Sequence, residues 1–449
     1  LMLACRVHSS SPSTRLVLEL RRSGMQRVPA ASPKALCHDA DGEGTPTTSK
    51  STVSSLGSEQ GPSTKDGFPQ LLPSAAPVSG LQTARSGCGG CFSLLLGISP
   101  RKHVQDKGGF SAILRRKRST SSSLYTLDQF EHVGLLGCGA FGAVTLVKCK
   151  VTSRTLAMKA VSKGLIVQRR MQLPVLREKE IMKKSAGNPF VVKLVATLVD
   201  DERLYFLMEP AMGGDLGTVY IRYPLFGSEA YARFYTACIF RALEHLHESK
   251  VVYRDVKMEN VVVDRNGYGK LCDFGMATCL TEQNDRAYTI CGTPGYMAPE
   301  VASGSGYAYA ADWWSLGILL YELMVGELPF ISPDPADMAA KRSFDITAVP
   351  MPEGAVWADL VRSICTQAPG ERLPMLAGGS RALQAHPWYS SAGFDWASHA
   401  TQEMVASHLP VVDGPEDLSN FGASWFDRPR SMFYVDPGTG WDDNFEEDA

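Results

Sequence analysis

Three glycines with the spacing G-x-G-x-x-G lie between two strand-like stretches and limit the possible folds more than any other feature of this sequence. Gly137, Gly139 and Gly142 are followed by Val144, and the strand-like pattern continues to Lys150. Glycine allows a sharp turn and brings backbone amides close to a polyphosphate. Because no Gly-Lys-Ser/Thr follows and no helix pattern begins, a Walker loop and a dinucleotide-binding fold are both disfavoured. Taken alone, the segment fits a glycine-rich hairpin without a ligand equally well.

A lysine in the next strand-like stretch has the surroundings of a partly buried charge. Lys159 comes seventeen residues after Gly142 and ends the apolar run Leu156-Ala157-Met158. Its stem would be half buried, so its ammonium group needs a counter-charge. The helix-like residues 175–184 offer Glu178 as that partner. An ordinary lysine on an edge strand is the alternative interpretation.

A second cluster of charged residues follows the stretch 228–249, whose apolar pattern predicts a long buried helix. Asp255 is followed by Lys257 and Asn260, and Asp273 comes eighteen residues after Asp255 in the triplet Asp273-Phe274-Gly275. Such residues supply a proton acceptor, a positive charge for a phosphate and oxygen ligands for a divalent cation. Each short pattern alone can arise by chance, but their common order and separations favour one phosphate-handling site.

These segments together resemble a eukaryotic protein kinase domain of the AGC group over residues 130–389. Tyr253, in place of the usual His, is a feature of that group. Four later motifs are also typical of the group. They are Cys291-Gly292-Thr293-Pro294, Ala298-Pro299-Glu300, Asp312-Trp313-Trp314-Ser315-Leu316-Gly317 and His386-Pro387-Trp388. Near the C-terminus, Ser419-Asn420-Phe421 is similar to the segment of this group that folds over the adenine pocket. Trp441-Asp442-Asp443-Asn444-Phe445 is similar to the terminal WDxxF of cyclic-GMP-dependent protein kinases.

The resemblance implies an α+β, two-lobed protein kinase fold, and the N-terminal segment before it is expected to be disordered from its composition. A small antiparallel β lobe with one main helix is expected over residues 130–209, and a larger, mainly helical lobe over residues 210–389. A C-terminal tail of the AGC type is expected over residues 390–449. The aromatic residues spaced along this acidic segment, among them Trp396, Phe426, Phe433 and Phe445, are expected to dock on the domain. Glu300 and Arg372 are expected to form the buried ion pair of the large lobe.

The resemblance also implies ATP and Mg²⁺ as cofactors and assigns a role to each site residue. Asp255 would orient the acceptor hydroxyl and take its proton, and Lys257 would neutralise charge on the transferred group. Asn260 and Asp273 would hold Mg²⁺. The residues expected to surround ATP are Gly137, Gly139, Gly142, Val144, Ala157, Lys159, Glu178, Glu209, Ala211 and Phe421.

The expected substrate is a protein with Arg or Lys before the phosphorylated Ser or Thr. Asp215, Glu259 and Glu322 match the acidic residues that receive those basic side chains, although each taken singly could be an ordinary surface acid. An apolar pocket for the residue after the acceptor is expected from Ile290, Pro294 and Met297. Thr289 matches the activation-loop phosphorylation site, where an upstream kinase would create a partner for Arg254.

Charge is distributed unevenly along the 449 residues. Residues 1–120 contain 16 basic and 7 acidic residues, whereas residues 401–449 contain 2 basic and 11 acidic residues. A nucleic-acid-binding protein would carry its basic excess on the folded body, so that class is disfavoured. Residues 1–120 are rich in Ser, Pro and Gly without a sustained hydrophobic period, which predicts a disordered basic segment.

Cysteine usage and hydropathy indicate the compartment. Eleven cysteines without a repeated spacing, and no evident signal peptide, favour a reducing compartment. A cytoplasmic location is expected, with access to the nucleus left open. No transmembrane segment is expected, because the apolar residues 91–98 fall far short of the roughly 20 that a membrane-spanning helix needs. Cys88-Gly89-Gly90-Cys91 is an isolated C-x-x-C, so a zinc site is disfavoured.

Several interpretations stay open. The basic run at residues 115–118 before Ser119-Thr120 resembles a substrate and could be self-inhibitory, although such runs are more often solvated, nuclear-targeting or acid-binding. Residues 1–120 are too few and too polar for a cyclic-nucleotide-binding domain, which leaves a regulatory chain or a domain outside this sequence. The alternatives to a cyclic-GMP-dependent type are a cyclic-AMP-dependent-type catalytic subunit, a pseudokinase scaffold and a kinase of small molecules. Met258 and Gly295 depart from the usual Pro and Glu of the family pattern.

Overall fold

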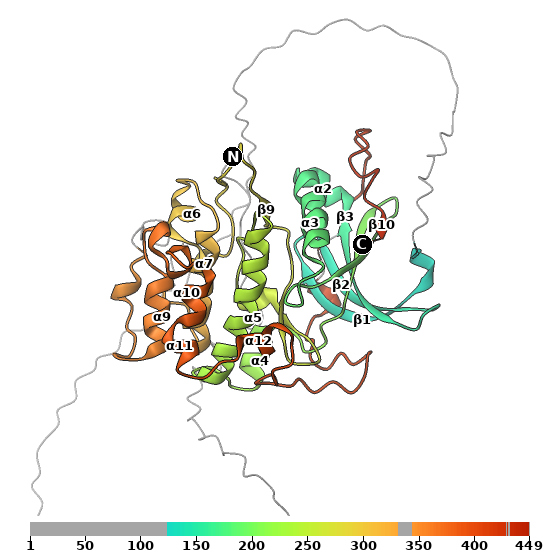
Figure 1. Cartoon of the computed structure of the whole chain (residues 1–449). Helices are drawn as coiled ribbons and strands as arrows, with labels where there is room; N and C mark the ends of the chain where they lie inside the picture. The colour runs from blue at the N-terminus through green and yellow to red at the C-terminus, as the bar shows by residue number, and fades with distance from the viewer. Residues whose placement is uncertain (1–123, 331–343, 428, 430–431, 449) are drawn as a thin grey trace, which may run out of the picture. The chain divides into compact units, whose positions relative to one another are not determined.

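The computed structural model describes residues 124–330, 344–427, 429 and 432–448, all of which belong to one compact unit (Figure 1). The expectations for residues 1–120, including the disordered segment, the basic run and the C-x-x-C, lie outside the described residues. The two-lobed α+β fold expected from the sequence is confirmed: an antiparallel sheet and two helices form one lobe, and helices dominate the other.

The small lobe is built on a six-stranded antiparallel sheet with the order β1-β2-β3-β5-β4-β10. Along its strands, apolar residues either alternate with more polar ones or follow one another without a break, because both faces of the sheet are covered. On β5, Phe206 and Met208 face the larger core, whereas Tyr205 and Leu207 face a second cluster on the opposite side. The strands are β1 (Phe130–Gly139), β2 (Gly142–Cys149), β3 (Thr155–Ser162), β4 (Leu194–Val199), β5 (Arg203–Met208) and β10 (Glu447–Asp448).

Two helices follow β3, where the sequence predicted one main helix. That main helix is α3 (Gln172–Ser185), and the additional one is the short α2 (Lys163–Gln168). Helix α2 begins where the Ser162 hydroxyl accepts a hydrogen bond of 3.3 Å from the Leu165 amide. A single capped turn has too few residues to show a helical period, so the sequence pattern did not predict it.

Two long helices form the centre of the large lobe. The stretch 228–249 was expected to be a long buried helix, and α5 (Glu229–Glu248) confirms this. Helix α7 (Ala310–Val325) packs beside it and ends at Gly326, whose φ of 84° favours glycine. The shorter helices of this lobe and of the tail are α4 (Leu216–Arg222), α6 (Pro299–Ser303), α9 (Val356–Ile364), α10 (Ser380–Ala385), α11 (Pro387–Ser390) and α12 (Trp396–Ala400).

Two short ladders hold the loops that lie between the lobes. They pair β6 (Val251–Val252) with β9 (Thr278–Cys279), and β7 (Val261–Val263) with β8 (Gly269–Leu271). The chain leading into β4 is joined to β8 directly, because the Val192 amide donates to the Leu271 carbonyl at 2.9 Å. The loops after β6 and β8 are therefore fixed at both ends.

The expected ion pair of the large lobe is present. The Arg372 guanidinium donates from Nη1 to Glu300 Oε1 at 2.6 Å and from Nη2 to Oε2 at 2.8 Å. The Arg372 side chain is fully buried, and Nη1 also donates to the Ala310 carbonyl at 2.7 Å. Because the pair is bidentate and the other donors of Arg372 are satisfied, it fixes α6, which carries Glu300, to the start of α7 at Ala310.

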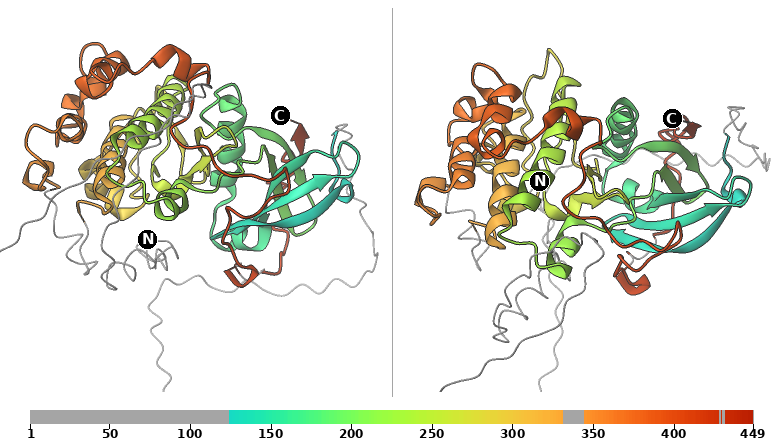
Figure 2. Two further views of the ribbon diagram at one scale, coloured as in Figure 1. Left: turned by 90° about the horizontal axis from the view of Figure 1, so that it is seen from below. Right: turned by 60° about the horizontal axis from the view of Figure 1, so that its bottom comes forward.

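The tail runs from the large lobe back to the sheet of the small lobe (Figure 2). Its aromatic residues were expected to dock on the domain, and Trp396 and Phe445 do so against Phe240 and Phe206. Phe426 and Phe433, in contrast, are 99% and 85% exposed, so for these two the expectation is wrong. Aromatic spacing in an irregular segment does not define a face, and only the packing decides which rings are covered.

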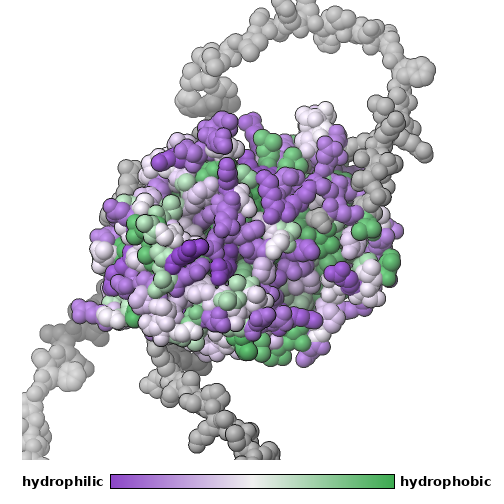
Figure 3. Space-filling model, in the orientation of Figure 1, coloured by the Kyte–Doolittle hydropathy of each residue, from purple (hydrophilic) through white to green (hydrophobic). Residues whose placement is uncertain are grey.

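The visible surface is mixed: polar residues cover much of the face in Figure 3, with apolar residues scattered among them. Among the described residues, no helix is long and apolar enough to cross a membrane.

Candidate active site

The glycine-rich segment is the hairpin that joins β1 to β2. Gly139 pairs with Gly142 at its end, and Gly137 pairs with Val144. At Gly142 a Cβ atom would lie 1.7 Å from the Ala160 carbonyl oxygen, so the sheet leaves no room for a side chain there. At Gly137 and Gly139 a Cβ atom would meet nothing within 4 Å. Glycine at those two positions keeps open a space beside the hairpin that a phosphate group can enter.

Lys159 lies in the middle of the sheet, on β3 between Val144 of β2 and Phe206 of β5. Its Nζ donates to Glu178 Oε1 at 2.7 Å and to Asp273 Oδ1 at 3.0 Å. The counter-charge expected from α3 is therefore present, and Asp273 is a second one. Only 5% of the Glu178 side chain is exposed, because α3 packs this face against the sheet.

The three charges influence one another's pKa. Burial lowers the pKa of Lys159, but the charges of Asp273 and Glu178 outweigh it, and the pKa is raised. Lys159 in turn holds the pKa of Asp273 below its usual value, whereas burial raises that of Glu178. Lys159 is thus a permanent cation and Asp273 a permanent anion at neutral pH, as binding of phosphates and a metal ion requires.

Asp255 is the centre of a second hydrogen-bonded network. Its Oδ2 accepts from Lys257 Nζ at 2.8 Å and from Asn260 Nδ2 at 2.8 Å, and its Oδ1 accepts from the Thr293 hydroxyl at 2.8 Å. Lys257 Nζ also donates to Thr293 Oγ1 at 3.0 Å. The loop at residues 253–260, termed the catalytic loop after the role expected for Asp255, and the segment before α6 therefore meet at one carboxylate, which is held in a single orientation.

Sequence reasoning assigned no role to two residues that position this loop. Thr293 was noted only as part of a motif, and its contact with Asp255 spans 38 positions. Asp312, also noted only within a motif, is fully buried and accepts from the Tyr253 amide at 2.8 Å and the Arg254 amide at 2.7 Å. No local pattern predicts such contacts, although a carboxylate amid the apolar residues of α7 indicates a buried partner.

The backbone is strained at two points of the site. Arg254 and Asp273 have φ angles of 71° and 56°, in the left-handed region that non-glycine residues rarely adopt. The surrounding contacts maintain this conformation at Arg254, whose Nε donates to the Met276 carbonyl at 2.5 Å. Such strain is concentrated at functional sites, where it orients particular side chains.

The groups expected to hold Mg²⁺ fit that ion. Asn260 uses its Nδ2 on Asp255, with 2.9 Å to the carbonyl and 2.8 Å to Oδ2, so its amide oxygen is the atom left for a cation. Asp273 is an ionised carboxylate near the same loop. In the part of the chain that is described, no group of three or more His, Cys, Asp or Glu could hold a metal by itself. Two oxygen ligands completed by phosphates and water suit Mg²⁺ that arrives with a nucleotide.

The segment expected to receive adenine follows β5. The Glu209 carboxylate accepts from Lys270 Nζ at 2.8 Å and from the Lys193 amide at 3.0 Å, so this side chain is bound to the protein itself. The expected contact of this segment with the base is through the backbone of Glu209 and of Ala211. Ala157 is buried on β3.

The tail is fixed next to this segment by a contact that the sequence did not indicate. Asn420 is 5% exposed and donates from Nδ2 to the Met212 carbonyl at 3.1 Å. Its Oδ1 accepts from Arg222 Nη1 at 2.7 Å. Asn420 thereby brings the half-buried Phe421 close to the connection between β5 and α4, and the contact of Phe421 with ATP stays a prediction.

The three acids expected to bind a basic substrate influence one another electrostatically. Burial raises the pKa of Glu322 to about 7, and Glu259 contributes to that rise. The pKa of Glu259 is also raised, by loss of solvation and by the charge of Asp215, although its side chain reaches the surface and is exposed. Glu322 accepts a hydrogen bond from the Tyr296 hydroxyl. Asp215 also has a structural role, because it caps α4 by accepting from the Thr218 amide at 2.9 Å.

The segment between Asp273 and Glu300, which carries Thr289, is joined to the catalytic loop through Tyr307. The Tyr307 hydroxyl donates to the Thr289 carbonyl at 2.6 Å and accepts from Arg254 Nη1 at 3.2 Å. The Thr289 side chain is exposed. Its backbone is linked to the Arg254 side chain through the Tyr307 hydroxyl.

The apolar pocket expected for the residue after the acceptor is lined by residues of differing exposure. Ile290 is 55% exposed, Pro294 is exposed and Met297 is half-buried.

The groups expected to bind a polyphosphate, a divalent cation and an acceptor hydroxyl thus occur together between a β lobe and a helical lobe. The class of protein that combines this fold with these groups is the protein kinases. The protein-family profile for the protein kinase domain matches residues 130–389, and the chain belongs to that family.

Among curated proteins the chain is similar to cGMP-dependent protein kinases. A cGMP-dependent protein kinase (isozyme 2) of Drosophila melanogaster is 36% identical over 78% of this chain and 37% of its own length. The cGMP-dependent protein kinase egl-4 of Caenorhabditis briggsae is 37% identical over 71% of this chain and 42% of its own length. Human cGMP-dependent protein kinase 2 is 35% identical, over 74% and 43%. The chain therefore spans less than half the length of the curated relatives it matches.

Proposed function

We propose that this protein transfers the γ-phosphoryl group of ATP to Ser or Thr in proteins, at sites preceded by Arg or Lys. The observation that carries the proposal is the network around Asp255, in which Lys257, Asn260 and Thr293 hold one carboxylate. A carboxylate in this position can orient a hydroxyl and accept its proton, and the adjacent lysine can balance charge on the transferred group.

The other residues of the site would bind the phosphates and the metal ion and neutralise their charges. Lys159, fixed by Glu178, would grip the phosphates beneath the glycine hairpin. Asp273 and Asn260 would hold Mg²⁺, which supplies charge neutralisation on the phosphates when bound. Because this reaction depends mainly on positioning and electrostatics, the chain's contribution is to hold these charges in place before substrate arrives.

The preference for basic peptides is supported by the mutual effect of the groove acids. The half-buried Glu322 and the exposed Glu259 both have raised pKa values, because each has lost solvation and lies near another carboxylate. An arginine or lysine of the substrate would relieve this repulsion and replace lost solvation. Proton and cation thus compete for the same carboxylates, which makes peptide affinity depend on pH.

The pH dependence can be stated with its sign. The KM for an arginine-containing peptide is expected to rise several-fold, at most about tenfold, as the pH falls from 8 to 6. The reason is that a carboxyl keeps only about a tenth of its charge one unit below its pKa, and burial raises the pKa of Glu322 to about 7. Steady-state kinetics with saturating ATP measure this. Glu322→Gln should give a high KM with a much weaker pH dependence, and the exposed Glu353→Gln should behave as the wild type. A wild-type KM that is constant from pH 6 to 8 would contradict this prediction.

Substrate class is tested with three peptides and the full chain. Initial rates of phosphate transfer are compared for Arg-Arg-Ala-Ser-Leu, for its Ala-Ala-Ala-Ser-Leu form and for its Arg-Arg-Ala-Tyr-Leu form. We expect transfer to the first only. Equal rates with the first two would refute the basic preference, and transfer to Tyr would refute the Ser/Thr assignment.

Regulation and location are part of the proposal. The relatives are named as cGMP-dependent, but the chain matches less than half of their length. We expect transfer by this chain to be indifferent to added cGMP, with any such control supplied by a regulatory chain or a further domain.

Phosphorylation of Thr289 by an upstream kinase would give Arg254 a stronger partner than the Tyr307 hydroxyl. Cytoplasmic protein substrates are the expected partners.

A further inference from the structure

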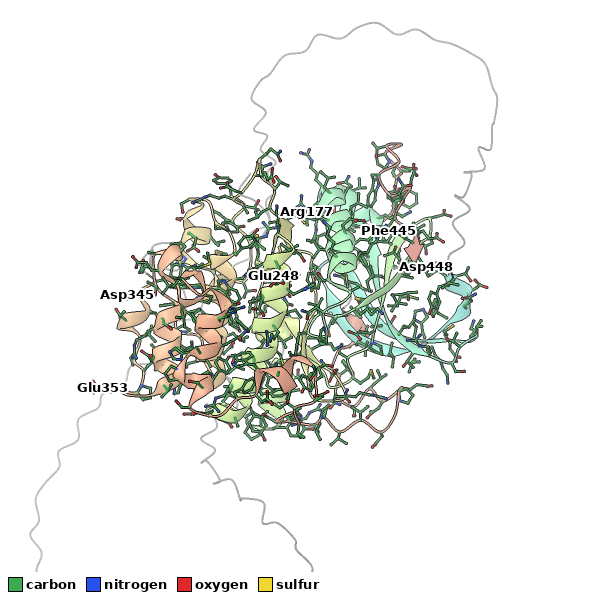
Figure 4. All side chains as sticks on the ribbon, viewed as in Figure 1. Arg177, Glu248, Asp345, Glu353, Phe445 and Asp448 are labelled. Carbon is green, nitrogen blue, oxygen red and sulfur yellow. The ribbon has the colours of Figure 1, made fainter. Side chains whose placement is uncertain are left out.

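The short helix α2, which the sequence did not predict, is attached to the small lobe on several sides. It begins at Ser162, the last residue of β3, whose hydroxyl caps it. Its residues Leu165 and Ile166 are buried. Helix α2 contacts both β3 and α3, the helix on which Figure 4 labels Arg177. Because close-packed elements shift little, the two ends of α2 are fixed points against which a neighbouring loop can be held.

Both ends of α2 contact one residue of the glycine hairpin. Phe141 lies in the two-residue turn between the paired Gly139 and Gly142. At the start of α2, the Ser162 amide donates to the Phe141 carbonyl at 3.0 Å. At its end, the guanidinium carbon of Arg169 lies over the Phe141 ring, 5.1 Å from the centroid. The tip of the hairpin is thus held through its backbone by one end of the helix and through a side chain by the other.

The contact of Arg169 with Phe141 is a cation–π interaction. A guanidinium within about 6 Å of a ring centroid is attracted by the negative face of the ring. The Arg169 backbone is fixed, since its amide donates to the Leu165 carbonyl at 3.0 Å. Its side chain is exposed, whereas Phe141 is half-buried against the larger core. Such a contact is too weak to hold a domain together, but it is large enough to bias the position of a two-residue turn.

The rest of the hairpin is packed unevenly. At Gly142 a Cβ atom would lie 1.7 Å from the Ala160 carbonyl oxygen, whereas at Gly137 and Gly139 it would meet nothing within 4 Å. The hairpin is therefore pressed against β3 on one side of the turn and open on the other, and Phe141 lies between the two. A phosphate that enters the open side would meet amides whose position depends on how Phe141 is held.

We propose that Arg169 is a positioning residue for the nucleotide: its guanidinium holds the Phe141 ring and keeps the tip of the glycine hairpin where its amides can bind phosphates. The proposal rests on the proposed function, because the hairpin is expected to bind the phosphates of ATP. It goes beyond that function, since it assigns a part in nucleotide binding to α2. Arg169 itself is not among the residues expected to contact ATP or the peptide.

The first test compares ATP with adenosine, which has the same base and ribose but no phosphate. Isothermal titration calorimetry of the full chain with Mg²⁺ and without peptide gives both dissociation constants. In Arg169→Ala the Kd of ATP is expected to rise about two- to fivefold, as loss of an exposed cation–π contact predicts, and that of adenosine to stay within about 1.5-fold. Arg169→Lys should recover part of the loss, since an ammonium group is also attracted by a ring face. Arg170→Ala, at the adjacent exposed arginine, is the matched control and should leave both constants unchanged.

The second test shows if Arg169 acts through the ring of Phe141. Phe141→Leu keeps an apolar side chain and removes the ring. In the Phe141→Leu chain, Arg169→Ala is expected to raise the Kd of ATP by less than about 1.5-fold, because the two residues act as one unit. In the transfer assay with ATP varied, Arg169→Ala should raise KM together with Kd and keep kcat within about twofold of wild type.

Three results would overturn the proposal. They are an unchanged Kd of ATP in Arg169→Ala, an equal rise with and without the Phe141 ring, and a Kd of adenosine that rises as much as that of ATP. A wild type that binds ATP but transfers no phosphate would refute the proposed function alone, and the binding constants would still test the role of Arg169. A wild type that does not bind ATP would overturn both.

Discussion

Asp273→Asn is expected to lower kcat for peptide phosphorylation at least about a thousandfold, equivalent to roughly 4 kcal/mol of barrier. Asp273 is one of two oxygen ligands expected for Mg²⁺, and Lys159 beside it holds its pKa below the usual range, so its charge is always present. The neutral amide keeps the shape of the carboxylate and loses the charge that would hold the cation.

This effect is measured by single-turnover and steady-state transfer from ATP and Mg²⁺ to the basic peptide. Asp201→Asn, an exposed residue in the turn between β4 and β5, is the matched control and should keep wild-type kcat within about twofold. A kcat for Asp273→Asn within tenfold of wild type would show that Asp273 does not hold the metal ion.

The second large effect is on stability. Arg372→Ala is expected to lower the free energy of unfolding by about 3–5 kcal/mol, because breaking a buried pair leaves the Glu300 carboxylate without its cation. The lost guanidinium also leaves the Ala310 and Thr366 carbonyls, now at 2.7 and 3.0 Å, without their donor. Arg372→Lys should recover only part of this loss, since an ammonium group cannot form the bidentate contact.

Urea unfolding followed by far-UV circular dichroism measures this stability difference. The exposed Arg381→Ala, in α10, is the control and should change the free energy of unfolding by less than about 0.5 kcal/mol. A loss below about 1 kcal/mol for Arg372→Ala would mean that the pair contributes to neither the stability of the large lobe nor the placement of α6.

The sequence predicted those parts of the fold that show a periodic pattern over many residues or a distinctive spacing of motif residues. Helix α5 was expected at residues 228–249 and runs from Glu229 to Glu248, because twenty residues show the helical period clearly. The glycine hairpin, Lys159 and Glu178 were placed correctly relative to one another, since the spacing that suggested them follows from strand and helix geometry. Helix α2 and strand β10 were not predicted, because two to six residues carry no periodic pattern.

The sequence did not predict the contacts that orient the site, and the reason is a different one. Thr293 and Asp312 lie 38 and 57 positions after Asp255, and only the packing of α7 beneath the catalytic loop brings the latter to the Tyr253 and Arg254 amides. The acid at 215 was expected to bind substrate, yet it also caps a helix. A residue type indicates what a side chain can do, whereas its partners depend on the whole fold.

The account depends on one claim, that Asp255 prepares a Ser or Thr hydroxyl for phosphoryl transfer. The most direct test is the initial rate of transfer from ATP and Mg²⁺ to Arg-Arg-Ala-Ser-Leu by the full chain, beside Asp255→Asn. The account predicts turnover by the wild type in the range of about 1–100 per second and a loss of at least roughly a thousandfold in the variant. Nucleotide binding without any transfer by the wild type, even after phosphorylation of Thr289, would contradict the account and make a pseudokinase scaffold the better description.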